Sequence, residues 1–253
     1  MTFHMAESLV EFNETVQRAG QTPVASVAEL GILGPDVILG HCIYVSGHST
    51  TSWPYKGDLE LIAASGATVA HAPLTFARRG VKLESFQRYR DHGVNVGIGT
   101  DTYPLDILSE MQAACLTGKI ADTNFESATA RDVFNAATLG GARALGREDL
   151  GRLAPGAKAD LVVVGLDTLR VGPYRDPIRA LLYCGNGMLV DTVIVGGQVV
   201  VENARLRSWD EGQILADVRA SSARVWDGFA TYDQRGRTVE DVYPPSFGSW
   251  EGP

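Results

Sequence analysis

The sequence has few cysteines, fewer basic than acidic residues and no long hydrophobic run. Its three cysteines, Cys42, Cys115 and Cys184, are far apart and form no CxxC pair, which argues against a disulfide framework or a structural zinc motif. With 22 basic against 30 acidic residues and a net charge of −8, the chain offers no positive field for nucleic acid or anionic lipid. Because no segment approaches the roughly 20 apolar residues of a membrane span, and no basic region followed by an apolar one begins the chain, we predict a cytoplasmic protein.

Four short apolar segments each end in a residue that can bind a metal or carry a proton. They end at His4, His41, His71 and Asp101, which are separated by 37, 30 and 30 residues. These intervals match strand–helix–strand units of about 30 residues or a little more. Active-site residues of parallel α/β folds lie at the carboxyl ends of the strands. The pattern therefore predicts a parallel α/β array that presents these four side chains to a common centre.

Apolar periodicity and turn residues predict the elements around these strands. The segments expected to be helical are 8–19, 23–33, 57–65, 82–92, 107–116, 128–145, 177–183 and 210–229. Long loops are expected at 42–56 and 72–80, directly after two of the strands, where loops often carry function. A strand is expected at 159–164, a hairpin at 191–201 with Gly196-Gly197 at its turn, and a loose tail at 232–253.

A single histidine or aspartate at a strand end is more often structural than functional, but four at a repeating interval favour a site. Asp101 could both bind a metal and accept a proton from a bound water. His48 and His92 are assigned structural roles. For Arg78-Arg79, a solvated turn and an anion clamp are equally open, and Trp53 and Phe76 either line a pocket or cover it, with lining favoured.

Several motifs occur in the order found in one enzyme superfamily. They are His4-Met5-Ala6-Glu7, Gly40-His41-Cys42, His71-Ala72-Pro73 and Gly99-Thr100-Asp101, followed by residues 140–146 and 151–161. In series, these motifs resemble the second half of the amidohydrolase superfamily, in the branch that contains triazine hydrolases, guanine deaminase and S-adenosylhomocysteine deaminase. The resemblance extends to about residue 205.

The resemblance implies strands 5 to 8 of a distorted (β/α)8 barrel and the carboxyl-terminal part of a small β-sandwich. The half-barrel would occupy residues 1–148, the sandwich remnant 149–208, and a last helix with a loose tail 209–253. Because four strands cannot close an eight-stranded barrel, the chain is expected to be unstable alone, to form a homo-oligomer or to need a complementing amino-terminal half.

The resemblance also implies hydrolysis of a non-peptide C–N bond, as deamination or dechlorination of a heterocyclic ring by metal-bound hydroxide. One divalent metal is expected, zinc or alternatively iron, with His4 and Asp101 as ligands. Asp101 would also act as the base, Glu7 would move a proton and contact the substrate ring, and His41 would orient the attack. His41 is also expected to contact the substrate, and His71 either contacts the substrate or lies directly behind the residues that do. Apart from the resemblance, Arg78 and Trp53 are further candidate substrate contacts.

Two departures from the family pattern bear on activity. The early His-x-His pair is absent, so two expected metal ligands are missing. Leu74-Thr75-Phe76 stands where the family carries a Ser-Asn pair, which leaves the substrate open. We therefore expect the isolated chain to bind metal weakly and to turn over no heterocycle. The alternative is a non-catalytic half-barrel that serves as a remnant or scaffold.

Overall fold

The structure of the protein is a computed structural model that describes residues 1–248. The chain divides into two compact units, Met1–Val199 and Val200–Pro253. The first unit contains every residue predicted to take part in a site. Within residues 1–248, no helix is both long enough and apolar enough to cross a bilayer.

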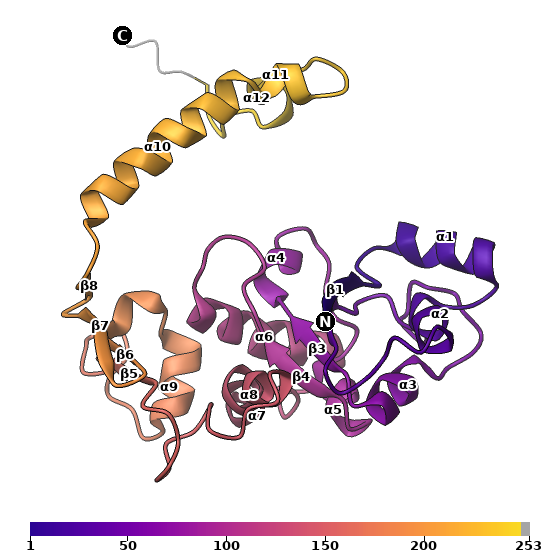
Figure 1. Ribbon diagram of the computed structural model, residues 1–253, viewed down its shortest axis with the longest axis horizontal. Helices are drawn as coiled ribbons and strands as arrows, with labels where there is room; N and C mark the ends of the chain where they lie inside the picture. The colour runs from indigo at the N-terminus through magenta and orange to yellow at the C-terminus, as the bar shows by residue number, and fades with distance from the viewer. Residues whose placement is uncertain (249–253) are drawn as a thin grey trace. The chain divides into compact units, whose positions relative to one another are not determined.

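Four parallel strands form the sheet that positions the candidate site. They are β1 (Thr2–Met5), β2 (Ile38–His41), β3 (Thr68–His71) and β4 (Asn95–Ile98). The order in the sheet is β1-β2-β3-β4, so β1 and β4 are its edges. Figure 1 labels β1, β3 and β4 of this sheet. The predicted α/β class is therefore confirmed, although the last strand ends three residues before Asp101.

The register of the sheet follows its apolar residues. Leu39 pairs with Val69, and Val69 pairs with Val96. All three side chains are buried in one core, which explains why these strands read as short continuous apolar runs rather than as alternating ones. Because the strands run in the same direction, their carboxyl ends open at one edge of the sheet.

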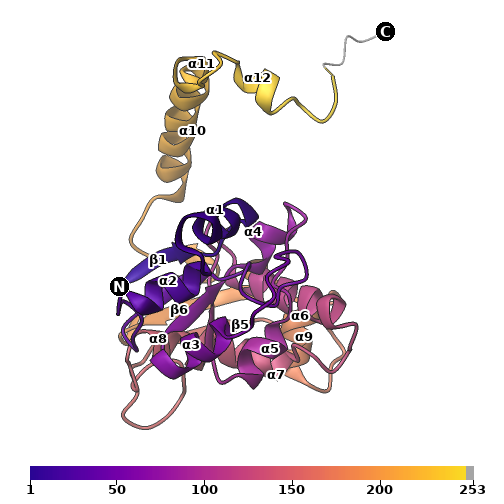
Figure 2. The same ribbon diagram turned by 90° about the vertical axis from the view of Figure 1, so that its right-hand side faces the viewer.

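The helices of the first unit lie close to their predicted positions. They are α1 (Leu9–Ala19), α2 (Pro23–Glu29), α3 (Asp58–Ser65), α4 (Pro73–Ala77), α5 (Phe86–Asp91), α6 (Ile107–Asp122), α7 (Ala130–Asn135), α8 (Gly141–Ala144) and α9 (Pro177–Cys184). α1 is bounded by local signals, since the Ser8 hydroxyl accepts the Glu11 N–H and Gly20 takes a left-handed conformation. α2 packs beside α3, and α9 packs beside α6 and α7 (Figure 2).

Two expected helix boundaries were wrong, and one short helix was not expected. The helix expected at 82–92 begins only at Phe86, because Ser85 caps it and Glu84 instead accepts hydrogen bonds from Ser49. The loop expected at 72–80 contains the short helix α4. α6 continues to Asp122, six residues beyond its predicted end, before Thr123 turns left-handed.

The helix expected at 128–145 is interrupted by one π-helical turn, Ala136–Gly140, between α7 and α8. This turn packs on β4. Asn95 fixes it there by donating a hydrogen bond from its side-chain amide to the Gly140 carbonyl, at 3.0 Å. The packing of the π-helical turn on the sheet therefore replaces the regular helix that the sequence pattern predicts.

A second, antiparallel pairing follows the parallel sheet. β5 (Leu161–Val164) pairs with β6 (Val190–Val195), and the 3-10 turn Gly187–Leu189 precedes β6. β7 (Gln198–Glu202) starts directly after the Gly196-Gly197 turn, which confirms the predicted hairpin. The unit boundary falls within β7.

The second unit begins in β7, which pairs with β8 (Arg205–Leu206). It continues with α10 (Glu211–Asp227), α11 (Phe229–Tyr232) and α12 (Val239–Val242). The tail expected to be loose thus carries a short helix, and its last five residues lie outside the described part of the chain. The domain boundaries expected after residues 148 and 208 stay predictions.

Candidate active site

Three chemically active side chains meet where β1 and β2 end. His41 Nε2 lies 3.0 Å from His4 Nδ1, and the same His4 nitrogen lies 3.1 Å from a carboxylate oxygen of Glu7. One ligand atom from each of the three residues lies within 4.8 Å of the others. The structure therefore brings together three of the predicted site residues, two on the neighbouring strands β1 and β2 and Glu7 two residues beyond the end of β1.

Left-handed backbone conformations turn these side chains at the strand ends. His41 and Cys42 have φ values of 72° and 46°, and Ala6, between His4 and Glu7, has a φ of 48°. Such values are uncommon for residues other than glycine, and they cluster where a site constrains the chain. The Cys42 backbone is tied down by hydrogen bonds, because its N–H donates to the Met5 carbonyl at 2.9 Å and its carbonyl accepts from the buried Tyr89 hydroxyl.

Packing, together with the contact to His4, orients the His41 ring. The ring is 5% exposed, and its Nδ1 has no hydrogen-bond partner within residues 1–248. Phe76 from α4 packs edge-on against it, with the ring centroids 4.8 Å apart. Burial lowers the pKa of His41, although the negative charges of Glu7 and Asp101 act in the opposite direction. The neutral ring can therefore accept a proton.

His71, at the end of β3, is buried behind this cluster. Burial and then the neighbouring His41 lower its pKa to about 4. Its ring packs on Phe86, with the centroids 6.2 Å apart. The residue fits a neutral, packed imidazole better than an exposed substrate contact.

We expect this burial to make the stability of the chain depend on pH. Since the pKa of His71 is about 4 in the folded chain and 6.5 is the ordinary value, the unfolded chain takes up the proton first as the pH falls. The stabilisation is fully present above pH 6.5 and is lost toward pH 4, by up to about 3 kcal/mol. Urea unfolding of the wild type and His71→Gln between pH 7 and pH 4 measures this, and parallel pH profiles for the two proteins would contradict it.

Asp101 does not join the three-residue cluster. It lies three residues beyond β4, is exposed, and has a φ of 54°. Its charge nevertheless acts on His41 and on Glu110, a buried carboxylate of α6. Asp101 is therefore near enough to contribute to the field of the site, but the described residues do not group its oxygens with His4.

Arg78 and Trp53 both contact other side chains of the fold. The Arg78 guanidinium stacks over the Tyr103 ring at 4.4 Å and donates to the Tyr103 carbonyl at 2.5 Å, so it anchors the loop that follows β4. Trp53 packs edge-on against Phe12 of α1, with the centroids 6.4 Å apart. The predicted substrate contacts of both residues stay predictions.

Of two further residues near the site, the sequence left the role of Arg79 open between a solvated turn and an anion clamp, and Glu110 was missed. Arg79 lies 4.0 Å from the Glu7 carboxylate and over the Phe76 ring at 5.7 Å. Glu110 is fully buried and accepts a hydrogen bond from the Leu74 N–H at 2.8 Å. A lone carboxylate on the apolar face of α6 was the signal that could have identified Glu110.

The donor set of the cluster suits a divalent cation. Two imidazoles and a carboxylate are the ligand types that zinc prefers in catalytic sites. Among residues 1–248, His41 Nδ1 has no hydrogen-bond partner, so this imidazole is not held by structural hydrogen bonds at both nitrogens. His4, Glu7 and His41 therefore fit as part of a metal site.

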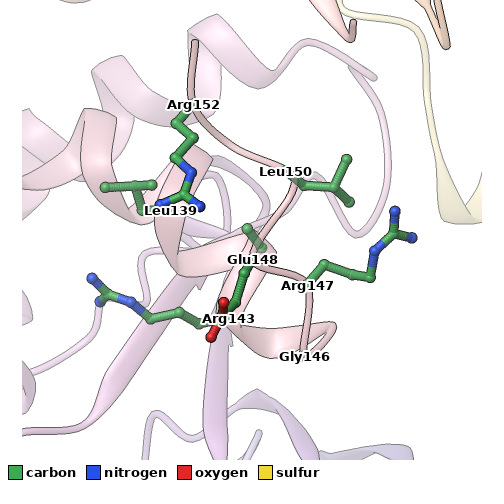
Figure 3. Close-up of a pocket in the computed structure, with 8 residues that line it drawn as sticks. Leu139, Arg143, Gly146, Arg147, Glu148, Leu150 and Arg152 are labelled. Atoms are coloured by element: carbon green, nitrogen blue, oxygen red, sulfur yellow. The ribbon is translucent and has the colours of Figure 1, made fainter. Parts of the chain in front are cut away.

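A surface hollow beyond α8 is lined by residues of the Leu139–Arg152 segment, but its charges do not converge (Figure 3). The guanidinium groups of Arg143 and Arg147 point to opposite sides. Arg147 is also engaged by Asp149, with two hydrogen bonds of 2.7 Å. The hollow thus lacks the convergent polar groups that define a ligand site.

Comparisons with known proteins agree on one family. The profile described as the Amidohydrolase family matches residues 1–200. A 5-methylthioadenosine/S-adenosylhomocysteine deaminase of Natronomonas pharaonis is 33% identical over 227 residues, which are 88% of this chain and 50% of that protein. A 5'-deoxyadenosine deaminase of Methanosarcina acetivorans is 31% identical over 226 residues, again 88% of this chain and 50% of the relative.

Solved structures show the same correspondence. An adenosine deaminase from Xanthomonas campestris with bound zinc superimposes with a TM-score of 0.79 at 28% identity, over 88% of this chain and 50% of that one. A variant of atrazine chlorohydrolase from Arthrobacter aurescens, complexed with zinc and atraton, gives a TM-score of 0.75 at 30% identity, over 87% of this chain and 48% of that one. The chain spans about half the length of the curated relatives it matches.

Proposed function

This chain belongs to the amidohydrolase family, and from that premise we propose that it supplies one half of an active site for hydrolytic deamination of an adenine-type ring. The observation that carries the proposal is the cluster of His4, Glu7 and His41 at the carboxyl ends of neighbouring parallel strands. The curated relatives named as adenosine-derivative deaminases supply the substrate class.

We assign His4 of this cluster as one metal ligand and Asp101, which lies outside the cluster, as a second, with zinc as the ion and iron as the alternative. When bound, such a cation lowers the pKa of water and so makes a nucleophile accessible near neutral pH. Glu7 lies at hydrogen-bond distance from His4 and can carry a proton between the attacking water and a ring nitrogen. His41, held between His4 and Phe76, orients the attack.

The fold supports a shared rather than a complete barrel. β1 and β4 pair with no further strand among residues 1–248, so two edges of a short parallel sheet offer free backbone groups. We propose that the four strands are strands 5 to 8 of a (β/α)8 barrel whose other strands come from a complementing amino-terminal half. We further propose the half-barrel at 1–148, the β-sandwich remnant at 149–208 and the terminal helix and tail at 209–253.

The proposal predicts inactivity alone and activity after reconstitution. We define the reconstituted enzyme as this chain mixed with the half of the Natronomonas pharaonis relative that it does not match, in the presence of Zn²⁺. Ammonia release from 5'-methylthioadenosine should appear only in the mixture, because two ligands hold a metal weakly.

The controls are each half alone and the mixture treated with a chelator. Stoichiometric zinc and measurable deamination in the isolated chain would contradict the predicted division of the site. Continued failure of the mixture, with both halves folded and bound to each other, would favour a non-catalytic half-barrel instead.

Dechlorination is a second candidate, favoured by the 30% identity to atrazine chlorohydrolase. Deamination and dechlorination differ in the leaving group on the ring carbon. A panel of aminated purines, aminated pyrimidines and chlorinated triazines, offered to the reconstituted enzyme, distinguishes them by whether ammonia or chloride is released.

A further inference from the structure

Glu110 is an ionisable group that the proposed reaction leaves unused, and it is buried at considerable cost. Its side chain, on α6, is 0% exposed. Oε2 accepts one hydrogen bond, from the Leu74 N–H at 2.8 Å, and Oε1 has no partner among the described residues. A buried carboxylate with a single hydrogen bond does not recover its desolvation cost. Its position therefore calls for a role other than stabilising α6.

The hydrogen bond from Leu74 identifies that role, because it joins α6 to the start of α4. α4 begins at Pro73, two residues after His71, and its N-cap residue Ala72 has no side chain that can accept a hydrogen bond. The first N–H groups of a helix lack partners within that helix. Glu110 supplies the missing acceptor from a helix 36 residues further along the chain.

α4 connects the two parts of the candidate active site. On one side Phe76 packs against His41. On the other, the Thr75 hydroxyl donates to the Thr100 carbonyl at 3.1 Å, next to Asp101. His41 Nε2 contacts His4, but among residues 1–248 the Nδ1 on the other side of the ring has no hydrogen-bond partner. The orientation of the ring therefore depends on Phe76 as well as on His4.

We propose that Glu110 is a positioning residue of the candidate active site. By capping α4 it holds Phe76 against His41 and keeps the loop that carries Asp101 in place. The inference rests on the proposed function for its catalytic meaning. The contacts that carry it are internal to this chain, so they can be tested without turnover.

The first test is limited proteolysis of the 253-residue chain with trypsin. Arg78 and Arg79 directly follow α4 and provide cleavage sites that report its release. In Glu110→Ala, cleavage after these residues should rise about tenfold or more, because the lost hydrogen bond lets α4 open locally. Glu110→Gln retains an acceptor for the Leu74 N–H and should stay within about threefold of the wild type.

The matched control for general destabilisation is Val133→Ala. Val133 is fully buried on α7, away from α4, and its truncation leaves a cavity without touching the cap. It should lower global stability without early cleavage at Arg78-Arg79. The proposal would be overturned if Val133→Ala were cleaved after Arg78 and Arg79 as fast as Glu110→Ala. It would also be overturned if Glu110→Ala were cleaved there no faster than the wild type.

The second test follows the His41 ring by ¹⁵N-edited NMR. The chemical shifts of its ring nitrogens should differ from the wild type in Glu110→Ala. In Glu110→Gln and Val133→Ala they should match the wild type. Phe76→Ala should reproduce the shift without the loss of the α4 cap. An unmoved His41 resonance in Glu110→Ala would overturn the positioning role.

Co²⁺ titration of the same variants separates this inference from the proposed function. If Co²⁺ binds the wild type, Glu110→Ala should bind it more weakly than Glu110→Gln. If no variant binds Co²⁺ even in the reconstituted enzyme, the metal assignment fails. In that event, the proteolysis and NMR results still decide the role of Glu110.

Discussion

Adding one methyl group at Gly140 should destabilise the chain by about 3 kcal/mol or more. Gly140 ends the π-helical turn that packs on β4, and a Cβ built there would lie 2.2 Å from the Val96 carbonyl oxygen. That atom belongs to the backbone of a core strand and cannot rotate away. Gly140→Ala must therefore shift the turn or break its packing on the sheet, and chemical denaturation of the purified variant measures the loss.

The neighbouring glycine provides the matched control. Gly141 has the same helical backbone, with φ −63° and ψ −42°, but a Cβ there would meet no atom of the described residues within 4 Å. Gly141→Ala should therefore be neutral or stabilising, by about 0.5 to 1 kcal/mol, because alanine loses less backbone entropy on folding. Similar effects of the two substitutions would show that the close approach of the π-helical turn to β4 is not what requires glycine.

The regular elements could be predicted because their signals are local. Ser8 and Gly20 bound α1 within its own sequence, and the apolar runs ending at His41 and His71 match the strands at their last residues. The meeting of His4 and His41 could also be predicted, since consecutive parallel strands place their carboxyl ends at one edge of a sheet.

The elements that escaped prediction depend on distant contacts. α4 has no local cap and relies on Glu110, 36 residues away from Leu74. The π-helical turn forms where Gly140 packs closely against the backbone of Val96. The apolar pattern of residues 128–145 contains no signal for a contact with a distant strand. Asp101 lies beyond the end of β4, in a left-handed backbone conformation. Knowing how many residues separate it from the strand was therefore not enough to predict where its carboxylate lies.

Replacing His41 by alanine should lower kcat of the reconstituted enzyme by about 10² to 10⁴-fold, the range of a positioned acid, base or orienting group. The ring is neutral, buried and 3.0 Å from His4, so it can accept or donate one hydrogen bond to the attacking water or the substrate. Alanine removes that contact, and the loss should appear mainly in kcat because the interaction forms as the reaction proceeds.

His92 is the matched control for this experiment, since it caps the end of α5 and lies 3.5 Å from Glu60 rather than near the cluster. Ammonia release by His92→Ala should stay within about threefold of the wild type, because a pair at the surface contributes little. A loss confined to KM in His41→Ala would place His41 in substrate binding alone. Full activity of His41→Ala would remove His41 from the mechanism. The nearest remaining proton carrier at the strand ends would then be Glu7, whose carboxylate lies 3.1 Å from His4.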